Sequence, residues 1–229
     1  MKHLLFSPQM KLADLLAANY KLLLVFDRFG IRLGFGDKSV KDVCTRYELP
    51  MSLFLTVCNV YTYEDFLPET DELQSFKVDS LIDYLKNSHR YYTEECLPAI
   101  SQKLDSVSDS LDLKYGTALK QFYRVYQNEV LNHFRYEEEV AFPYIKQLSE
   151  GIKNDRYNIG QFEKNHSDID EKLNDLKNII IKYLPGNSPS GQLNALLIEL
   201  FELEDDFLKH TLIENKILVP LVAQLEQQV

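Results

Sequence analysis

Glycine and proline are scarce in this 229-residue sequence, which has eight of each. Turn-rich β architectures need many such residues, so their scarcity argues against them and favours helices. Cysteine is scarce too: Cys44, Cys58 and Cys96 are odd in number and form no CxxC motif. This pattern argues against a disulfide framework and against a thiolate zinc site, and we expect three reduced, partly buried thiols.

Positive charge is in deficit, and long apolar runs are absent. The chain has 25 Lys and Arg against 35 Asp and Glu, a net charge of −10 that opposes nucleic-acid phosphates and anionic membranes. No apolar run approaches the ~18 residues of a membrane span, since "LLLVF" (22–26) ends at Asp27. The first residues, "MKHLLFSPQM", lack the apolar core of a secretory signal. We therefore expect a cytoplasmic protein without nucleic-acid or membrane partners.

Helical periodicity is what the sequence does contain. In residues 1–70 it predicts short helices at 10–29, 39–49 and 50–61, with Ser39 as an N-cap. The acidic stretch 62–76 has weaker periodicity and indicates a linker. Four longer helical segments follow at 77–104, 112–150, 156–184 and 189–228.

The short connections between the long segments favour antiparallel neighbours. The predicted fold class is therefore all-α: an up-down-up-down four-helix bundle over residues 76–229, preceded by a small helical N-terminal domain over residues 1–70. Pro98, Pro143 and Pro220 interrupt helical patterns, and each is expected to kink or end its helix by removing a backbone donor.

One histidine lies in each long segment: His89, His133, His166 and His210. The first and second are 44 residues apart, as are the third and fourth, so two helical hairpins carry their histidines in the same register. All four occupy apolar helical stripes, which predicts that they point into the bundle. Around His133 the residues of the stripe are Val130, Val140, Ala141 and Tyr144.

The second and fourth segments share a longer pattern. Each has a glutamate four residues after its histidine, Glu137 and Glu214, and a proline six residues further on. A four-residue step returns to the same face of a helix, so each histidine and its glutamate project toward one region.

Imidazoles and carboxylates in an apolar core would each incur several kcal/mol of desolvation unless a cation compensated them. A lone inward histidine is more often a hydrogen-bonded core residue, but the repeated set points to metal. Tetrahedral zinc is the chemical competitor and usually takes four ligands, whereas six ligands suit two ions. The candidate metal ligands are His89, His133, Glu137, His166, His210 and Glu214.

These segments resemble the hemerythrin-like HHE cation-binding fold and, more narrowly, the Repair of Iron Centers di-iron proteins. The resemblance covers residues 76–229 and is carried by "NSHRYYTEECLPAI", "NHFRYEEEVAFPYI", "FEKNHSDIDEKL" and "KHTLIENKILVPLV". The family's four histidines and two bridging glutamates fall on the six candidate ligands. The resemblance thus implies a cofactor of two iron ions, a non-haem di-iron centre with an oxo or hydroxo bridge.

The resemblance leaves the pairing of histidines on each iron open. By pseudo-two-fold symmetry one iron would take His89 with His210 and the other His133 with His166, while pairing by hairpin is equally compatible. Asp170 or Glu138 could hold the distal ring nitrogens of the ligand histidines.

Two departures from relatives of this kind bear on function. Oxygen carriers have a fifth core histidine, and Thr93 and Asp170 occupy the equivalent faces here. This favours reactivity with NO, peroxide or O₂, or iron donation, over oxygen carriage. The N-terminal segment is similar to the small domain that precedes the bundle, but Leu33-Gly34 stands where an adjacent cysteine pair is expected. Its expected role is docking or dimerisation, with a homodimer as one outcome.

The preferred function is a di-iron protein of the oxidative and nitrosative stress response. It would repair damaged iron–sulfur centres, with apo iron–sulfur proteins as partners, or react with NO. One rival is a di-iron O₂ or NO sensor that signals to a partner. Another is an iron-storage or structural metal domain.

Overall fold

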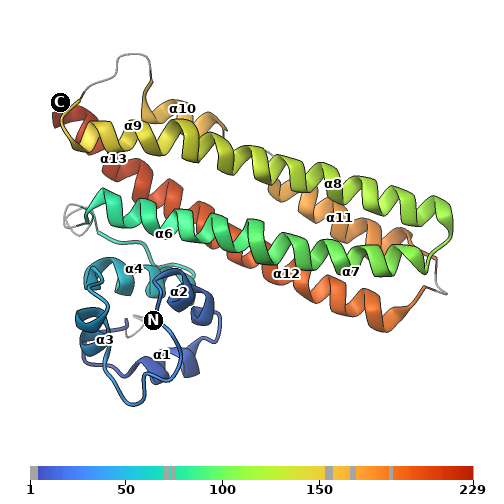
Figure 1. Cartoon of the computed structure of the whole chain (residues 1–229), viewed down its shortest axis with the longest axis horizontal. Helices are drawn as coiled ribbons and strands as arrows, with labels where there is room; N and C mark the ends of the chain where they lie inside the picture. The colour runs from blue at the N-terminus through green and yellow to red at the C-terminus, as the bar shows by residue number, and fades with distance from the viewer. Residues whose placement is uncertain are drawn as a thin grey trace. The chain divides into compact units, whose positions relative to one another are not determined.

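The computed structural model describes residues 5–69, 73, 76–152, 157–165, 169–185 and 188–228 (Figure 1). Within these residues the regular structure is helical, and β geometry is limited to an isolated bridge between Lys11 and Ser39. The packing divides the chain into two compact units, one of residues 1–88, 145–153 and 211–229 and the other of residues 89–144 and 154–210. None of the described helices combines the length and the apolar character that crossing a membrane requires.

The first unit begins with four short helices: α1 (Leu12–Ala18), α2 (Leu22–Arg28), α3 (Val40–Arg46) and α4 (Met51–Thr62). The helix predicted at 10–29 is therefore two helices. Asn19 lies between them. Its side-chain amide donates to the carbonyl of Tyr61 and to the hydroxyl of Thr62, and these bonds hold it in place where the helix is interrupted. Ser39 is the predicted N-cap of α3 and forms a capping box with Asp42.

These short helices pack against α6 (Val78–Tyr91). The ring of Phe29 lies 4.8 Å from that of Tyr84, centroid to centroid, and also contacts Phe54 at 5.3 Å. The Asn87 side chain donates to the carbonyl of Arg28 at 2.8 Å. The first unit is thus held by an aromatic core and a hydrogen bond that joins α2 to α6.

The second unit contains a four-helix core. Its long elements are α7 (Leu97–Asp109), α8 (Leu113–Tyr136), α11 (Ile169–Tyr183) and α12 (Ser190–Ile213), which run lengthwise in Figure 1. Buried side chains from all four form one hydrophobic cluster. The predicted all-α bundle is confirmed. The expected loop at 105–112 is shorter than predicted, because α7 continues to Asp109 and buries Val107 and Ser108.

The remaining elements complete the long helical runs. They are η1 (Tyr92–Cys96), η2 (Glu137–Ala141), α9 (Phe142–Ser149), α10 (Ile159–Asn165), η3 (Glu214–Leu218) and α13 (Val219–Gln228). The three η elements are π-helical turns that directly join one α-helix to the next.

Each π turn begins six residues before a proline. The turns start at Tyr92, Glu137 and Glu214, and the prolines are Pro98, Pro143 and Pro220. In every case the residue before the proline donates its backbone N–H to the first residue of the turn, five positions back. The sequence predicts that each proline kinks or ends its helix, and the structure shows that none of the three helical runs ends there: a wider turn accommodates the missing proline N–H, and the α-helix resumes.

Candidate metal centre

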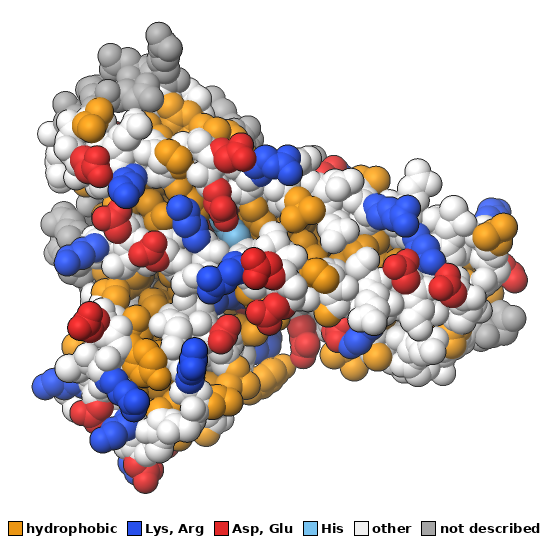
Figure 2. Space-filling model, in the orientation of Figure 1, with side chains coloured by type: hydrophobic (Ala, Val, Ile, Leu, Met, Phe, Trp, Pro, Cys, Tyr) orange, Lys and Arg blue, Asp and Glu red, His pale blue; other side chains and the backbone are white. Residues whose placement is uncertain are grey.

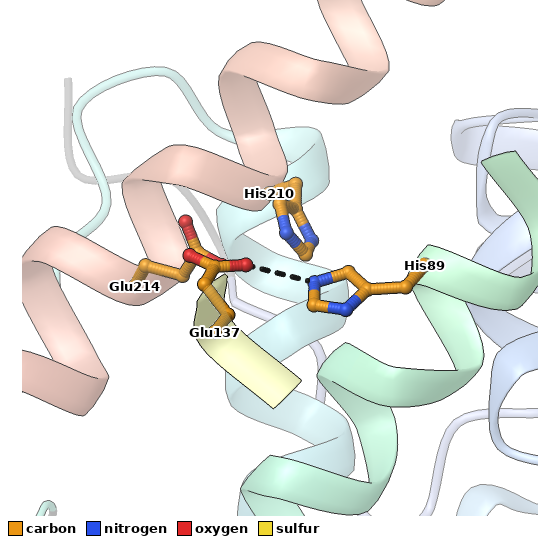
Figure 3. A group of neighbouring side chains, drawn as sticks. All are labelled: His89, Glu137, His210 and Glu214. Carbon is orange, nitrogen blue, oxygen red and sulfur yellow. Dashed lines mark ion pairs between the residues drawn. The ribbon is translucent and has the colours of Figure 1, made fainter. Parts of the chain in front are cut away.

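Four of the six predicted ligands lie together in the structure. His89 is in the last turn of α6 and His210 in that of α12, while Glu137 and Glu214 are the first residues of η2 and η3. Each is at most 1% exposed. Each offers one ligand atom, and these atoms all lie within 4.8 Å of one another, facing a common point in Figure 3.

The carboxylate of Glu137 lies between two imidazoles. Its Oε2 is 3.1 Å from Nε2 of His89, and its Oε1 is 3.3 Å from Nε2 of His133. His133 precedes Glu137 by one turn and is also buried, as the four-residue spacing predicts. A carboxylate that presents each oxygen to a different imidazole could share a metal ion with either of them.

The ring of His89 is held from both sides. Its Nδ1 is 2.9 Å from Oε1 of Glu138, a side chain that is partly exposed. When Nδ1–H donates to this carboxylate, the lone pair of Nε2 faces Glu137 and is available to a metal ion. Glu138 is therefore one of the two orienting residues that the sequence suggested, and the side chain of the other, Asp170, lies outside the described residues.

Aromatic rings enclose the two central imidazoles. Phe134 stacks on His89 with ring centroids 4.1 Å apart and an interplanar angle of 16°, and Phe142 lies parallel to it at 5.7 Å. His210 meets Phe134 edge-on at 5.9 Å. On the face drawn in Figure 2, histidine accordingly shows only as a small patch among charged side chains. The enclosure fixes the ring planes and keeps water from the nitrogen atoms.

The donor set fits a transition-metal ion. Two fully buried carboxylates close together repel each other in an environment of low dielectric, and a cation between them removes that penalty. Imidazole nitrogen with carboxylate oxygen suits iron, manganese or zinc, whereas sites for calcium or magnesium are built from oxygen atoms. The residues present therefore match a metal ion in both charge and ligand type.

One predicted ligand has no described position. His166 lies outside the described residues, as do the side chains of its neighbours 163–165. Its role stays a prediction.

Sequence reasoning missed Asp206, which is buried beside this group. The signal was available, because Asp206 precedes His210 by four residues and so shares its face of α12. It was overlooked because it belongs to no repeated motif.

One stripe residue was also misplaced. Val140, expected on the buried stripe, is 41% exposed. It lies inside η2, where the wider turn changes the helical register that its prediction assumed.

Comparison with protein families gives a match to the "Hemerythrin HHE cation binding domain" over residues 80–222, more than half of the chain. This stretch contains all six predicted ligands.

Comparison with curated proteins gives relatives of low sequence identity. The chain is 26% identical over 151 residues to the iron-sulfur cluster repair protein ScdA of two strains of Staphylococcus epidermidis, covering 64% of this chain and 67% of each relative. It is 25% identical over 144 residues to the iron-sulfur cluster repair protein YtfE of an Enterobacter species, covering 62% of this chain and 63% of that protein.

Proposed function

This chain belongs to the hemerythrin HHE cation-binding family, and from that premise we propose that it is a non-haem di-iron protein that repairs or supplies iron to damaged iron–sulfur centres. Its relatives are named iron-sulfur cluster repair proteins, and this supports the choice of iron–sulfur repair among the stress-response functions that the sequence suggested. Reaction with NO is the finer part of the proposal and depends on the same centre.

The observation that carries the proposal is the buried group of His89, Glu137, His210 and Glu214, whose ligand atoms lie within 4.8 Å of one another. We assign the metal ligands as these four residues together with His133 and His166. A bound pair of irons would supply redox chemistry and open coordination positions for a small ligand. The chain itself orients the ligands, neutralises the ions and excludes water.

The geometry favours one of the two pairings of histidines. His89 and His210 both belong to the four-residue group, with ring centroids 5.1 Å apart, so they suit a single ion. His89 and His133 face different oxygens of Glu137, so they suit different ions. In the proposed arrangement His89 and His210 would hold one iron and His133 and His166 the other, and Glu137 and Glu214 would supply the carboxylate ligands.

The test is iron transfer by the full-length, iron-loaded protein. It is incubated with an iron–sulfur dehydratase whose cluster has been damaged by peroxide or NO, and recovery of the dehydratase activity is followed over time. We expect recovery that depends on the loaded protein and exceeds that from the same amount of free ferrous iron. Glu137→Ala, which removes the central carboxylate, is expected to lose this activity, whereas Glu139→Ala in the same turn is expected to retain it.

The alternative functions give different results in the same assay. A storage or structural domain would bind iron without accelerating recovery beyond free iron. A sensor would show ligand-dependent association with a partner and no recovery. An iron-free protein after purification and reconstitution would remove the basis of the proposal.

A further inference from the structure

The three π turns do not all carry the same residue. Glu137 and Glu214 are the first residues of η2 and η3, and Tyr92 holds the corresponding position in η1. Tyr92 is fully buried, as the two glutamates are. The first helical run thus places a phenol where the other two runs place a metal-ligating carboxylate.

The hydroxyl of Tyr92 is bonded to a buried acid. It donates to Oδ2 of Asp206 at 2.6 Å, and Asp206 is itself only 6% exposed. Hydrogen bonds to a charged acceptor are among the stronger ones in proteins, and a buried carboxylate without such a donor is costly. The bond joins η1 to α12 one turn before His210.

The ring of Tyr92 packs against that of His210. Their centroids are 5.7 Å apart at an interplanar angle of 83°, an edge-to-face contact. Tyr92 is itself supported by Phe134, with which it stacks at 5.6 Å, and by Phe207 at 5.6 Å. Rotation of the His210 imidazole would require Tyr92 to move, and the bond to Asp206 opposes that movement.

We propose that Tyr92 and Asp206 form a positioning pair that holds the His210 imidazole in the orientation for metal binding. The inference rests on the proposed metal centre and adds to it two residues that are not ligands. The pair acts from one side of the centre, as Glu138 does on His89 from another. Asp206 lies on α12, the helix that also carries His210. The bond from Tyr92 to Asp206 therefore also fixes where η1 contacts α12, one turn before His210.

Cobalt(II) binding to the full-length protein tests the pair, because its visible absorption reports ligand geometry. Four proteins are compared with wild type: Tyr92→Phe, Asp206→Asn, the double variant, and Tyr123→Phe. Tyr123 is the matched control, a buried tyrosine of the same core whose hydroxyl donates to the carbonyl of Leu97 at 2.8 Å. Cobalt affinity is measured by chelator competition, and stability of the metal-free proteins by urea unfolding.

We expect Tyr92→Phe and Asp206→Asn each to weaken cobalt binding by roughly 10–100-fold, the usual range for groups that orient metal ligands, and to change the visible spectrum. The double variant should be no weaker than the poorer single variant, because both remove one interaction. Tyr123→Phe should lower stability but leave cobalt affinity and spectrum unchanged.

Unchanged cobalt affinity and spectrum in Tyr92→Phe, beside a wild-type protein that binds cobalt, would overturn the positioning role and leave the proposed centre standing. A wild-type protein that binds no cobalt would overturn both. Tyr92→Phe keeps the ring, so it decides the matter even if Asp206→Asn fails to fold.

Discussion

At the scale of single residues, Glu137 links two imidazoles of the candidate centre. It is fully buried, it faces His89 with one oxygen and His133 with the other, and it begins a π turn. A carboxylate in this position is unfavourable in the metal-free protein and favourable once cations are bound. Metal binding and folding should therefore be coupled through it.

Glu137→Ala tests this coupling. We expect the variant to lose bound iron and, with it, the stabilisation that a ligand at 100 times its dissociation constant provides, about 2.7 kcal/mol. Urea unfolding with and without iron measures the difference, and Glu139→Ala, an exposed acid of the same turn, serves as the control. Retention of the wild-type iron content by Glu137→Ala would contradict the assignment.

The cysteines allow a second test at this scale. Burial raises the pKa of the Cys44 thiol to about 11, and it raises the pKa of the fully buried Cys58 well above the ordinary value for a thiol. The thiolate is the reactive form, so it is scarce at neutral pH and grows about tenfold per pH unit below the pKa. Alkylation of native Cys44 should thus rise steadily from pH 7 to 10 without levelling off. Mass spectrometry of iodoacetamide-treated protein measures this, with urea-unfolded protein as the control. An alkylation rate that is half-maximal near pH 8.5 and levels off above that pH would show an ordinary, exposed thiol.

At the scale of elements, the approach of α7 to α8 depends on Gly116. A Cβ atom added there would lie 2.4 Å from the backbone carbonyl oxygen of Ser108, a distance that real contacts do not show. Since a backbone atom cannot turn aside as a side chain can, the two helices would have to separate. The short connection between them leaves little room for this.

Gly116→Ala is accordingly expected to destabilise the protein. Overpacking of this kind costs about 1–3 kcal/mol, of which the better helix propensity of alanine offsets about 1 kcal/mol. Gly191→Ala in α12 is the matched control, because nothing lies within 4 Å of its added Cβ, and it should stabilise by about 0.4–1 kcal/mol. Urea unfolding midpoints compare the two. Equal effects of both substitutions would show that α7 and α8 are not in tight contact.

At the scale of the whole molecule, the predicted metal ligands and the packing contacts of the N-terminal helices involve different residues. All six predicted ligands lie beyond residue 76, whereas Phe29 of the N-terminal region packs on Tyr84 of α6. Tyr84 is 1% exposed. The N-terminal helices therefore cover apolar surface of α6 without supplying a ligand, and their proposed role is docking or dimerisation.

Phe29→Ala in the full-length chain tests this separation. Phe29 is half-buried, so removing its ring should lower the free energy of unfolding by less than the about 3–5 kcal/mol typical of a large aromatic truncated in a core. Iron content and optical spectrum should stay at wild-type values. Removal of residues 1–70 extends the test, and its expected result is retained iron with reduced stability. Iron loss in the folded Phe29→Ala protein would contradict the separation.

The sequence alone determined the helical class and the buried face of four candidate ligands, His89, Glu137, His210 and Glu214, because these depend on periodicity within one element. It also located the N-cap at Ser39. A four-residue spacing places His133 with Glu137 and His210 with Glu214 whatever the rest of the chain does.

Only the tertiary structure decided which residues meet across helices. The bonds of Glu138 to His89 and of Tyr92 to Asp206 join residues 49 and 114 positions apart. Asn19 likewise divides α1 from α2 by reaching Tyr61, 42 positions away. Periodicity assigns a side chain to a face, but the level at which one helix crosses another depends on the packing of the whole core. The π turns were also decided only by the tertiary structure. A proline in the sequence shows that one backbone hydrogen bond is missing, but the surrounding packing selects whether the helix ends, kinks or forms a π turn there.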